Sequence, residues 1–301
     1  MPFTDWAIRR LPGPRARLLA ASLASFSLLA GSGNPKPGPA KDGGAKVAAK
    51  SGPKAEAKAK GPLVVLDAGH GGEDRGAHGP KGLQEKAAAL AIAKAVGAEL
   101  EKRGCRVAYT RSDDTFIPLW DRAKIANDEG ADLFLSLHLN AARARAATGS
   151  EVYFLSLGQA EADAQATADT ENGPPAADAA PGPDVVASIL DDLAQKAYLR
   201  DSQDLAVDIQ RELNRFAGIK ERGVKQAPFI VLRSAAMPAV LVESAFISNP
   251  REEKKLRDPA FVAKLGQAIA KGVKAYLEDS DGTVRRRAED GDHPAPIVRE
   301  R

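Results

Sequence analysis

A short apolar run that leads into a glycine-rich loop constrains the fold of this chain more than any other feature. Residues 63–66 read Leu-Val-Val-Leu and are followed by Asp-Ala-Gly-His, with the histidine at position 70. A glycine-rich loop at 71–82 then leads to Glu85 and to a helical pattern at 87–103. A buried strand, a loop and a helix form the first part of a βαβ unit. Because ligands of open α/β sheets bind beyond the carboxyl ends of the strands, we expect the functional site at this loop.

Strand and helix patterns alternate through the rest of the central region. Short apolar runs predict further strands at 105–110, 132–138, 151–157, 229–232 and 239–243. The spacing of apolar residues predicts helices at 119–129, 159–170, 185–198, 202–217 and 259–277. Strands that are apolar on both faces and alternate with helices are typical of sheets covered by helices. We therefore expect an α/β fold: a single three-layer domain with a mostly parallel or mixed sheet of about six strands and helices on both faces.

The two ends of the chain differ in composition from its middle. Residues 1–31 combine four arginines with a short apolar run, which predicts an export signal peptide; an uncleaved N-terminal tether is the alternative. Residues 32–62 are dominated by Pro, Gly, Ala and Lys and are expected to form a disordered linker. The charged stretch 280–301 is expected to be a disordered tail. The folded domain is therefore expected at 63–279.

Charge and cysteine content exclude several classes of protein. The 43 basic and 40 acidic residues give a formal charge of +3, and the basic residues are not interleaved with aromatic ones, so we expect no nucleic-acid binding. The single cysteine, Cys105, excludes a disulfide framework and a zinc site made of cysteines. An apolar content of 44% is enough for a sizeable core.

Four residues at expected strand ends and at a helix start indicate metal chemistry. His70 and Glu85 flank the glycine-rich loop, and His138 closes a second apolar strand. A histidine and a carboxylate are half of a catalytic zinc shell, and a second histidine extends it. Glu243 closes the run Pro-Ala-Val-Leu-Val, where a carboxylate is costly unless it is paired or lies next to a cation. Taken singly, such residues are more often hydrogen-bonded histidines or glutamates that complement a helix dipole.

Four sequence blocks resemble the signature blocks of the zinc-dependent N-acetylmuramoyl-L-alanine amidases of bacterial cell division. In chain order they are Leu-Asp-Ala-Gly-His-Gly-Gly (66–72), Glu-Lys (85–86), Ser-Leu-His-Leu-Asn-Ala (136–141) and Val-Glu-Ser-Ala-Phe-Ile-Ser-Asn (242–249). The resemblance spans roughly residues 63–277, in the order of the family. It places the zinc site at the carboxyl ends of the strands.

The resemblance implies one Zn²⁺ ion held by His70, Glu85 and His138, with Glu243 as the catalytic glutamate. Two histidines and a glutamate leave a fourth position for water, whose pKa the metal lowers to about 7. Glu243 is then the general base, which takes a proton as water attacks the lactyl carbonyl and returns it to the L-alanine nitrogen. The bond that breaks joins N-acetylmuramic acid to the stem peptide of peptidoglycan.

Three further residues are candidates for orienting the ligands or binding substrate. Asp67 is a candidate partner of a ligand imidazole, although a turn-forming aspartate at a strand end explains it almost as well. Asn140 belongs to the third block. Arg222 lies in Arg-Gly-Val-Lys, which resembles the family and either binds the anionic stem peptide or forms an edge strand with solvated charge.

The segment 158–201 resembles a regulatory insert. In position, and in residues 188–195, it is similar to the segment of division amidases that forms a helix over the zinc. The resemblance implies that an insert glutamate occupies the open metal position until a LytM-domain activator, EnvC- or NlpD-like, withdraws the helix. Glu171 is the first candidate and Glu161 the second. Because Ala, Gly and Pro dominate this stretch, a flexible surface loop is the alternative.

These features predict an exported, monomeric enzyme of the periplasm of a Gram-negative-type bacterium, which acts on peptidoglycan during wall remodelling and daughter-cell separation. A zinc carboxypeptidase-like peptidase is a second hypothesis, because two histidines and a glutamate on an α/β sheet serve peptide bonds equally well. A non-catalytic peptidoglycan-binding protein is a third. The presence of all four expected site residues argues against it.

Overall fold

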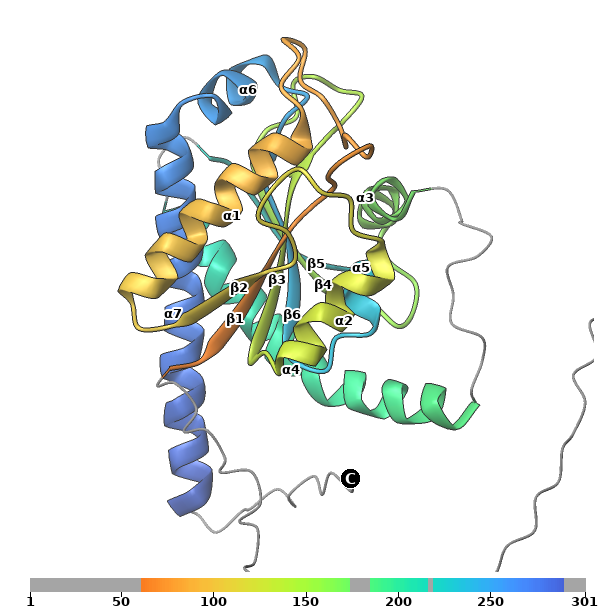
Figure 1. Cartoon of the computed structure of the whole chain (residues 1–301), viewed down its shortest axis with the longest axis vertical. Helices are drawn as coiled ribbons and strands as arrows, with labels where there is room; N and C mark the ends of the chain where they lie inside the picture. Colours follow the sequence, from red (N-terminus) through yellow and green to blue (C-terminus); the bar gives the residue numbers. More distant parts are fainter. Residues whose placement is uncertain (1–60, 174–184, 216–218, 290–301) are drawn as a thin grey trace, which may run out of the picture. The chain divides into compact units, whose positions relative to one another are not determined.

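The computed structural model describes residues 61–173, 185–215 and 219–289, with side chains described for all of these except 185–197 and 281–289. Six strands form one sheet in the order β2-β1-β3-β6-β4-β5 (Figure 1). Their bounds are β1 Leu63–Ala68, β2 Arg106–Tyr109, β3 Leu133–Asn140, β4 Ser150–Leu155, β5 Glu221–Ala227 and β6 Ala239–Phe246. The helices of the described residues are α1 Glu85–Lys102, α2 Leu119–Glu129, α3 Ala162–Asn172, α4 Val185–Asn214, α5 Ile230–Arg233, α6 Pro250–Leu256 and α7 Pro259–Glu289.

The sheet is mixed. Strands β2, β1, β3 and β6 run parallel to one another, whereas β4 runs antiparallel to β6 and parallel to β5. The carboxyl ends of β1, β3 and β6 therefore lie at one edge, together with the amino end of β4. This edge is where the predicted ligands His70 and His138 and the predicted base Glu243 are found. The predicted α/β domain with a six-stranded mixed sheet is confirmed.

Helices cover both faces of the sheet (Figure 1). Successive side chains of a strand point to opposite faces, so each strand contributes to two cores. In β1, Val64 and Leu66 pack in the core beneath α1, α4 and α7. Val65 packs in the second core, on the face of α2, α3 and α5. The sheet is apolar on both faces because both are covered.

One predicted strand is a helical turn. Residues 229–232 form mainly the short helix α5, and the strand lies just before it, at β5. A four-residue apolar run has no periodicity that separates a strand from a helical turn. Here Val231 and Leu232 are buried on the α2 face, which a single turn achieves as well as a strand does. The Arg-Gly-Val-Lys stretch forms the edge strand β5, but the charge of Arg222 is not simply solvated, because it pairs with the buried Glu151.

The two helices predicted at 185–198 and 202–217 are one continuous helix, α4. Ser202, the first residue of the second predicted helix, lies inside α4 and is buried. Its hydroxyl oxygen accepts a hydrogen bond from the backbone N–H of Ala239 at 2.9 Å, at the start of β6. Serine occurs both at helix caps and inside helices, so the residue type alone did not mark a boundary.

The last helix is longer than predicted. Helix α7 continues past residue 277 to Glu289, so residues 280–289 of the predicted tail are helical. The arginines, alanine and glutamate of this stretch are good helix formers and extend a helix that is already nucleated. Residues 1–60, which include the predicted export signal and nearly all of the predicted linker, lie outside the described residues, as do 290–301. Among the helices described, none has the length and apolarity needed to cross a membrane.

Candidate metal centre

Three ionisable side chains stand side by side at the functional edge of the sheet. The strand register pairs His138 of β3 with Glu243 of β6, and Glu243 with Glu151 of β4. Residues paired in this way point to the same face of a sheet. Phe134 and Tyr153, at even spacing in the same strands, place this face over the core beneath α2, α3 and α5. The three side chains are buried.

His70 reaches the same edge from the loop after β1. Its backbone φ of +59° makes it the one non-glycine residue in the left-handed region among the described residues. Such a conformation costs about 1–3 kcal/mol and persists where the surroundings fix it. Arg122 donates a hydrogen bond to the carbonyl oxygen of His70 at 3.1 Å, and Nδ1 of His70 lies 2.8 Å from Oδ2 of Asp74. These contacts fix the ring, with Nε2 directed at the site.

Glu85 is the first residue of α1 and is fully buried. Its Oε2 accepts a hydrogen bond from the N–H of Ala77 at 2.9 Å, and its Oε1 accepts one from the N–H of Leu139 at 3.0 Å. Burial raises the pKa of Glu85, but contacts with His138 and His70 outweigh burial and hold it below the usual range. The helix N-terminus also favours the anion. A charged carboxylate is thus fixed between the glycine-rich loop and β3.

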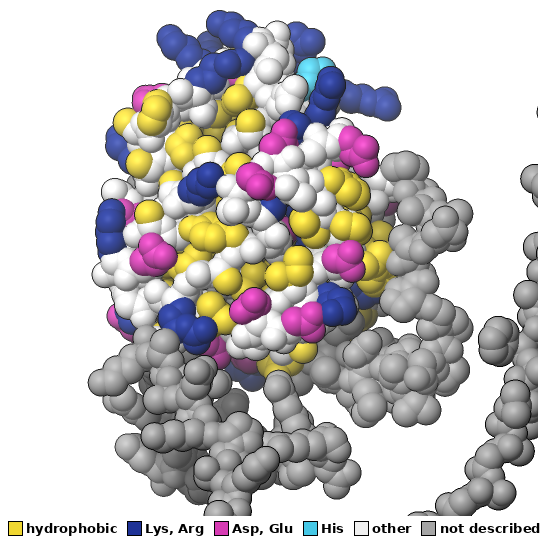
Figure 2. Space-filling model, in the orientation of Figure 1, with side chains coloured by type: hydrophobic (Ala, Val, Ile, Leu, Met, Phe, Trp, Pro, Cys, Tyr) yellow, Lys and Arg dark blue, Asp and Glu magenta, His cyan; other side chains and the backbone are white. Residues whose placement is uncertain are grey.

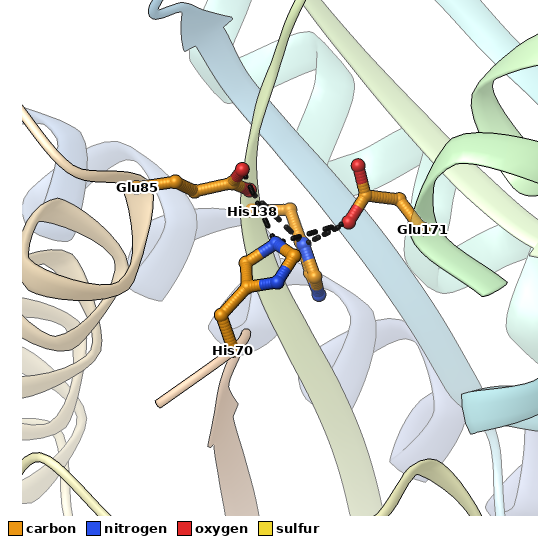
Figure 3. Close-up of side chains that lie close together, drawn as sticks. All are labelled: His70, Glu85, His138 and Glu171. Atoms are coloured by element: carbon orange, nitrogen blue, oxygen red, sulfur yellow. Dashed lines mark hydrogen bonds and ion pairs between the residues drawn. The ribbon is translucent and has the colours of Figure 1, made fainter. Parts of the chain in front are cut away.

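Nitrogen and oxygen atoms of four residues converge at this edge (Figure 3). Nε2 of His70 lies 3.2 Å from Oε2 of Glu85, and Nδ1 of His138 lies 3.2 Å from Oε1 of the same carboxylate. From α3, Oε2 of Glu171 lies 2.8 Å from Nδ1 of His138 and 3.2 Å from Nε2 of His70. Figure 3 shows the two imidazoles between the two glutamates. One ligand atom from each residue lies within 4.8 Å of the others.

The donor set suits a divalent cation such as zinc. Zinc binds His nitrogen and carboxylate oxygen at about 2.0–2.2 Å, which places tetrahedral donors about 3.4 Å apart, close to the separations seen here. Nε2 of His70 and Oε2 of Glu171 are buried without a hydrogen-bond partner. Although burial lowers the pKa of both histidines, the carboxylates raise it to about 12 for His70 and about 10 for His138. The cluster therefore strongly favours positive charge at its centre.

Two glycines make room for the ligands. A Cβ atom on Gly69 would lie 2.3 Å from Cε1 of His138. A Cβ atom on Gly76 would lie 2.5 Å from Cδ2 of His70 and 2.8 Å from Oε2 of Glu85. Gly76 also has a φ of +61°, which side chains disfavour. Glycine at these two positions, one just before the glycine-rich loop and one within it, therefore lets the backbone approach the cluster.

Glu243 is fully buried, and neither of its carboxylate oxygens has a hydrogen-bond partner among the described residues. Burial and the nearby charge of Glu171 raise its pKa well above the ordinary value, and the opposing effect of His138 is smaller. A buried carboxyl without partners, one strand away from a ligand, is placed to accept and return a proton.

Asp67 does not contact a ligand imidazole. Its carboxylate accepts hydrogen bonds at 2.6–2.9 Å from three side chains: Thr110, Arg122 and Ser136. Asp67 lies opposite Ser136, on the same face of the sheet as His138, but its carboxylate is taken up by these three donors. Asp74 lies in the turn that faces His70. Asp74 therefore takes the place that the sequence suggested for Asp67. Through Arg122, which also bonds to the carbonyl of His70, Asp67 supports the backbone of the loop.

Asn140 and Arg222 meet at Glu151 rather than at the ligands. Nδ2 of Asn140 donates to Oε2 of Glu151 at 3.0 Å, and Nε of Arg222 donates to Oε1. Lys225 and Tyr153 donate to the same carboxylate. Burial raises the pKa of Glu151, but these bonds outweigh burial and lower it. Asn140, Glu151 and Arg222 also line a cavity of about 440 Å³ that extends to Glu171.

The two insert glutamates lie in different places. Glu171, near the end of α3, joins the cluster, and its side chain is 7% exposed. Glu161 is exposed at the residue before α3 and does not reach the cluster. The side chains of residues 188–195, which also resemble the insert, lie outside the described ones.

The sequence profile of the N-acetylmuramoyl-L-alanine amidase family matches residues 64–275. The match contains every residue of the cluster and Glu243. The chain belongs to this family. Membership makes it a hydrolase of the bacterial cell wall.

Two curated amidases and one solved structure illustrate the similarity. AmiA of Escherichia coli K12 is 40% identical over 229 residues, which cover 75% of this chain and 79% of AmiA. AmiC of Neisseria meningitidis is 41% identical over 73% of this chain, which spans about half (53%) of the length of AmiC. The crystal structure of an N-acetylmuramoyl-L-alanine amidase from Clostridium difficile 630 aligns with a TM-score of 0.56 at 30% identity, covering 72% of this chain and 97% of that one.

Two residues of the centre were missed in the sequence. Asp74 lies among the glycines of the loop, and nothing in its neighbourhood predicts that it faces a ring four residues earlier. Glu151 had a recognisable signal, because it is a lone charged residue near the start of the apolar stretch Ser-Glu-Val-Tyr-Phe-Leu. The same signal singled out Glu243.

Proposed function

We propose that this chain is a zinc-dependent N-acetylmuramoyl-L-alanine amidase, which hydrolyses the amide between the lactyl group of N-acetylmuramic acid and L-alanine of the stem peptide. The observation that carries the proposal is the pairing of a His-Glu-His donor set with a buried, unpartnered glutamate on the adjacent strand. Family membership supports the choice of an amide in peptidoglycan over the carboxypeptidase-like alternative.

His70, Glu85 and His138 are the residues that would hold the ion. When bound, zinc lowers the pKa of water to about 7 and polarises a carbonyl oxygen. The two backbone N–H groups on Glu85 and the carboxylate of Asp74 on His70 fix the donors before the ion arrives. Fixed outer contacts of this kind orient ligands and raise metal affinity.

Glu243 carries the proton in this proposal. One of its unpartnered carboxylate oxygens accepts the proton of the attacking water and then delivers it to the L-alanine nitrogen as the C–N bond breaks. Its burial supports this role, because a desolvated carboxylate holds a proton more readily than an exposed one does. A non-catalytic wall-binding protein would have no use for such a group, whose burial is costly.

Glu171 suggests that the site is closed by α3. Its Oε2 approaches both histidines, on the side of the donor set opposite Glu85. We infer that Glu171 occupies the position that water and the substrate carbonyl need, and that α3 must move before hydrolysis. The partner proposed to withdraw it is a LytM-domain activator of the EnvC or NlpD kind.

The wider setting follows from the same proposal. The substrate is peptidoglycan, so we propose that residues 1–31 direct export to the periplasm, where the chain works as a monomer in wall remodelling and daughter-cell separation. The segment 32–62 would then be a spacer. The export signal and the spacer are proposed from the sequence pattern of residues 1–62, of which the structure describes 61 and 62.

The test uses the full chain and intact peptidoglycan. Purified protein is assayed as made, after chelation, and after chelation with zinc restored, and the released products are weighed by mass spectrometry. We expect free stem peptides that begin with L-alanine, lost with chelator and regained with zinc. Release of single terminal amino acids would indicate the carboxypeptidase-like alternative. If nothing is released, the Glu171→Ala variant is assayed in the same way. If that variant binds zinc and still releases no product, the proposal is overturned.

A further inference from the structure

A second cavity, with a basic lining, lies beside the metal centre. It has a volume of about 540 Å³ and is lined by His78, Gly79, Pro80, Ala142, Arg143, Arg145 and Ser248. Three of these side chains are basic and none is acidic. Ala142 and Arg143 also line the cavity that extends to Glu171, so the two cavities adjoin. Figure 2 shows Lys and Arg side chains gathered at this end of the molecule, over the loops next to α6.

The wall on the side of the glycine-rich loop is braced by α6. Both carboxylate oxygens of the buried Glu253 accept hydrogen bonds from the N–H of Lys81, at 3.0 and 2.8 Å, and Oε1 accepts one from the N–H of Leu83 at 3.1 Å. A Cβ atom on Gly79 would lie 2.4 Å from Cδ of Glu253, so this loop is packed tightly on α6. The wall is therefore formed before any ligand binds.

The opposite wall, residues 142–149, is held by the same helix and the turn before it. The N–H of Ala142 donates to Oγ of Ser248 at 3.0 Å, and Nδ2 of Asn249 donates to the carbonyl oxygen of Arg145 at 2.9 Å. The N–H of Gly149 donates to Oε1 of Glu252 at 3.1 Å. These bonds fix the backbone of the two arginines but leave their guanidinium groups free to meet a ligand.

Arg143 and Arg145 differ from the arginines around the metal centre. Arg122 pairs with Asp67, and Arg222 pairs with Glu151. Within the part of the chain that the structure describes, no carboxylate forms an ion pair with Arg143 or Arg145, and both residues are exposed. Two unpaired guanidinium groups at one preformed cavity favour an anion, and their planar donor geometry matches a carboxylate.

The position of the cavity indicates where that carboxylate comes from. The lactyl carboxyl group of the substrate forms the amide bond that the enzyme cleaves, so it carries no charge. The glycan beside the scissile bond is therefore uncharged at this group. The negative charge lies on the stem peptide, which carries free carboxylates. A basic cavity next to the cavity of the metal centre is therefore matched to the peptide side of the substrate.

We propose that Arg143 and Arg145, with His78, bind a free carboxylate of the acidic stem peptide and so determine specificity for the peptide; the inference rests on the proposed amidase function. The contact lies away from the bond that breaks, so it acts on substrate binding rather than on the chemical step. It also predicts that peptides with amidated carboxylates are poorer substrates.

The experiment compares the full zinc-loaded chain with the Arg143→Ala/Arg145→Ala variant on two soluble disaccharide-peptides, one with free carboxylates and one with amidated carboxylates. For the unchanged chain we expect the KM of the amidated substrate to be about tenfold higher, which is about 1.4 kcal/mol of binding. In the variant the KM of the acidic substrate should rise by about tenfold, kcat should stay within about twofold, and the difference between substrates should vanish. Arg200→Ala, in the exposed part of α4, is the matched control and should change neither constant.

Other outcomes would overturn the inference. If KM of the variant is unchanged, or is higher by the same factor for both substrates, the cavity does not bind the carboxylate. If no form of the chain cleaves either substrate, calorimetric binding of the acidic peptide decides: binding that the variant loses supports the inference although the proposed function has failed, and binding that it keeps, or no binding, overturns it. If inorganic phosphate competes while the two peptides bind equally, the site serves a different anion and the inference is wrong. An unchanged melting temperature of the variant verifies folding.

Discussion

The four residues of the cluster come from two regions that are held in place very differently. His70, Glu85 and His138 lie at a sheet edge where strands, a helix start and backbone N–H groups fix each donor. Glu171 lies on α3, in which Ala164 and Ala168 are the buried residues. Burying two methyl groups contributes only about 1.5 kcal/mol, less than one buried leucine. The comparison teaches that the sheet edge with His70, Glu85 and His138 is a fixed region of the fold, whereas α3 with Glu171 is a weakly attached region.

Apart from these two alanines and a 3.3 Å hydrogen bond from Tyr153 to Thr167, helix α3 is attached through its ends. Near its start, Oδ2 of the exposed Asp163 lies 2.6 Å from Nζ of the partly buried Lys225. An ion pair that is open to water on one side contributes about 1 kcal/mol at most. At its end, the side chain of Asn172 donates to the carbonyl of Pro228 at 3.0 Å and accepts from the N–H of Ile230 at 2.8 Å. Residues 174–184 follow and lie outside the described residues. We therefore expect that α3 is displaced more readily than the elements of the sheet.

The largest effect should come from a substitution in the fixed region, at the sheet edge. In His138→Ala a donor fixed on β3 is lost, so we expect zinc content near zero and activity lower by more than about 1000-fold. Metal analysis by mass spectrometry and peptide release measure both. Glu161→Ala, on the solvent-exposed side of the insert, is the control and should keep its zinc. A variant that binds zinc normally would show that His138 is not a ligand.

The next effect separates proton transfer from metal binding. Glu243→Gln keeps the shape of the side chain but cannot accept the proton, so we expect kcat to fall by about 10² to 10⁴ with zinc retained. Because Glu243 is a buried carboxylate without hydrogen bonds, the melting temperature should stay equal or rise. Loss of zinc together with activity would instead place Glu243 among the ligands.

A smaller change in activity, of opposite sign, is expected from a substitution in the weakly attached region, α3. Glu171→Ala removes the carboxylate that approaches both histidines, so we expect basal activity without an activator to rise by about tenfold while zinc stays bound. The rate of stem-peptide release from peptidoglycan is the measurement, and Glu161→Ala serves as the matched control. Unchanged or lost activity would contradict closure of the site by α3.

The smallest effect should come from the far end of α3. Asn172→Ala removes two hydrogen bonds, each worth about 0.5–1.5 kcal/mol, and shifts the helix toward release. We expect basal activity to rise by about three- to fivefold, with faster hydrogen exchange across α3 and no change at β3. If hydrogen exchange at β3 rose as much as at α3, the helix and the sheet edge would not be independent, which would contradict the difference between them.

The sequence by itself determined the sheet and the polar side chains that gather at one edge of it. Apolar runs that end in His70, His138 and Glu243 specify buried strands with polar ends, and parallel strands necessarily bring their carboxyl ends to one edge. Glu85 followed from the helix that begins after the glycine-rich loop. The placement of these side chains could be predicted because the alternation along a strand, and the burial that enforces it, are local properties of the chain.

Tertiary structure alone decided the rest. Asp74 replaces Asp67 at the imidazole because a turn, and not a strand, faces the ring. The contacts of Glu151 depend on donors from β3 and β5, which are separate in sequence, and on Tyr153 of its own strand. Residues 229–232 became a helical turn because a short apolar run packs well in either form. Side chains brought together across long stretches of chain leave no periodic signal, so only the folded arrangement reveals which of them meet.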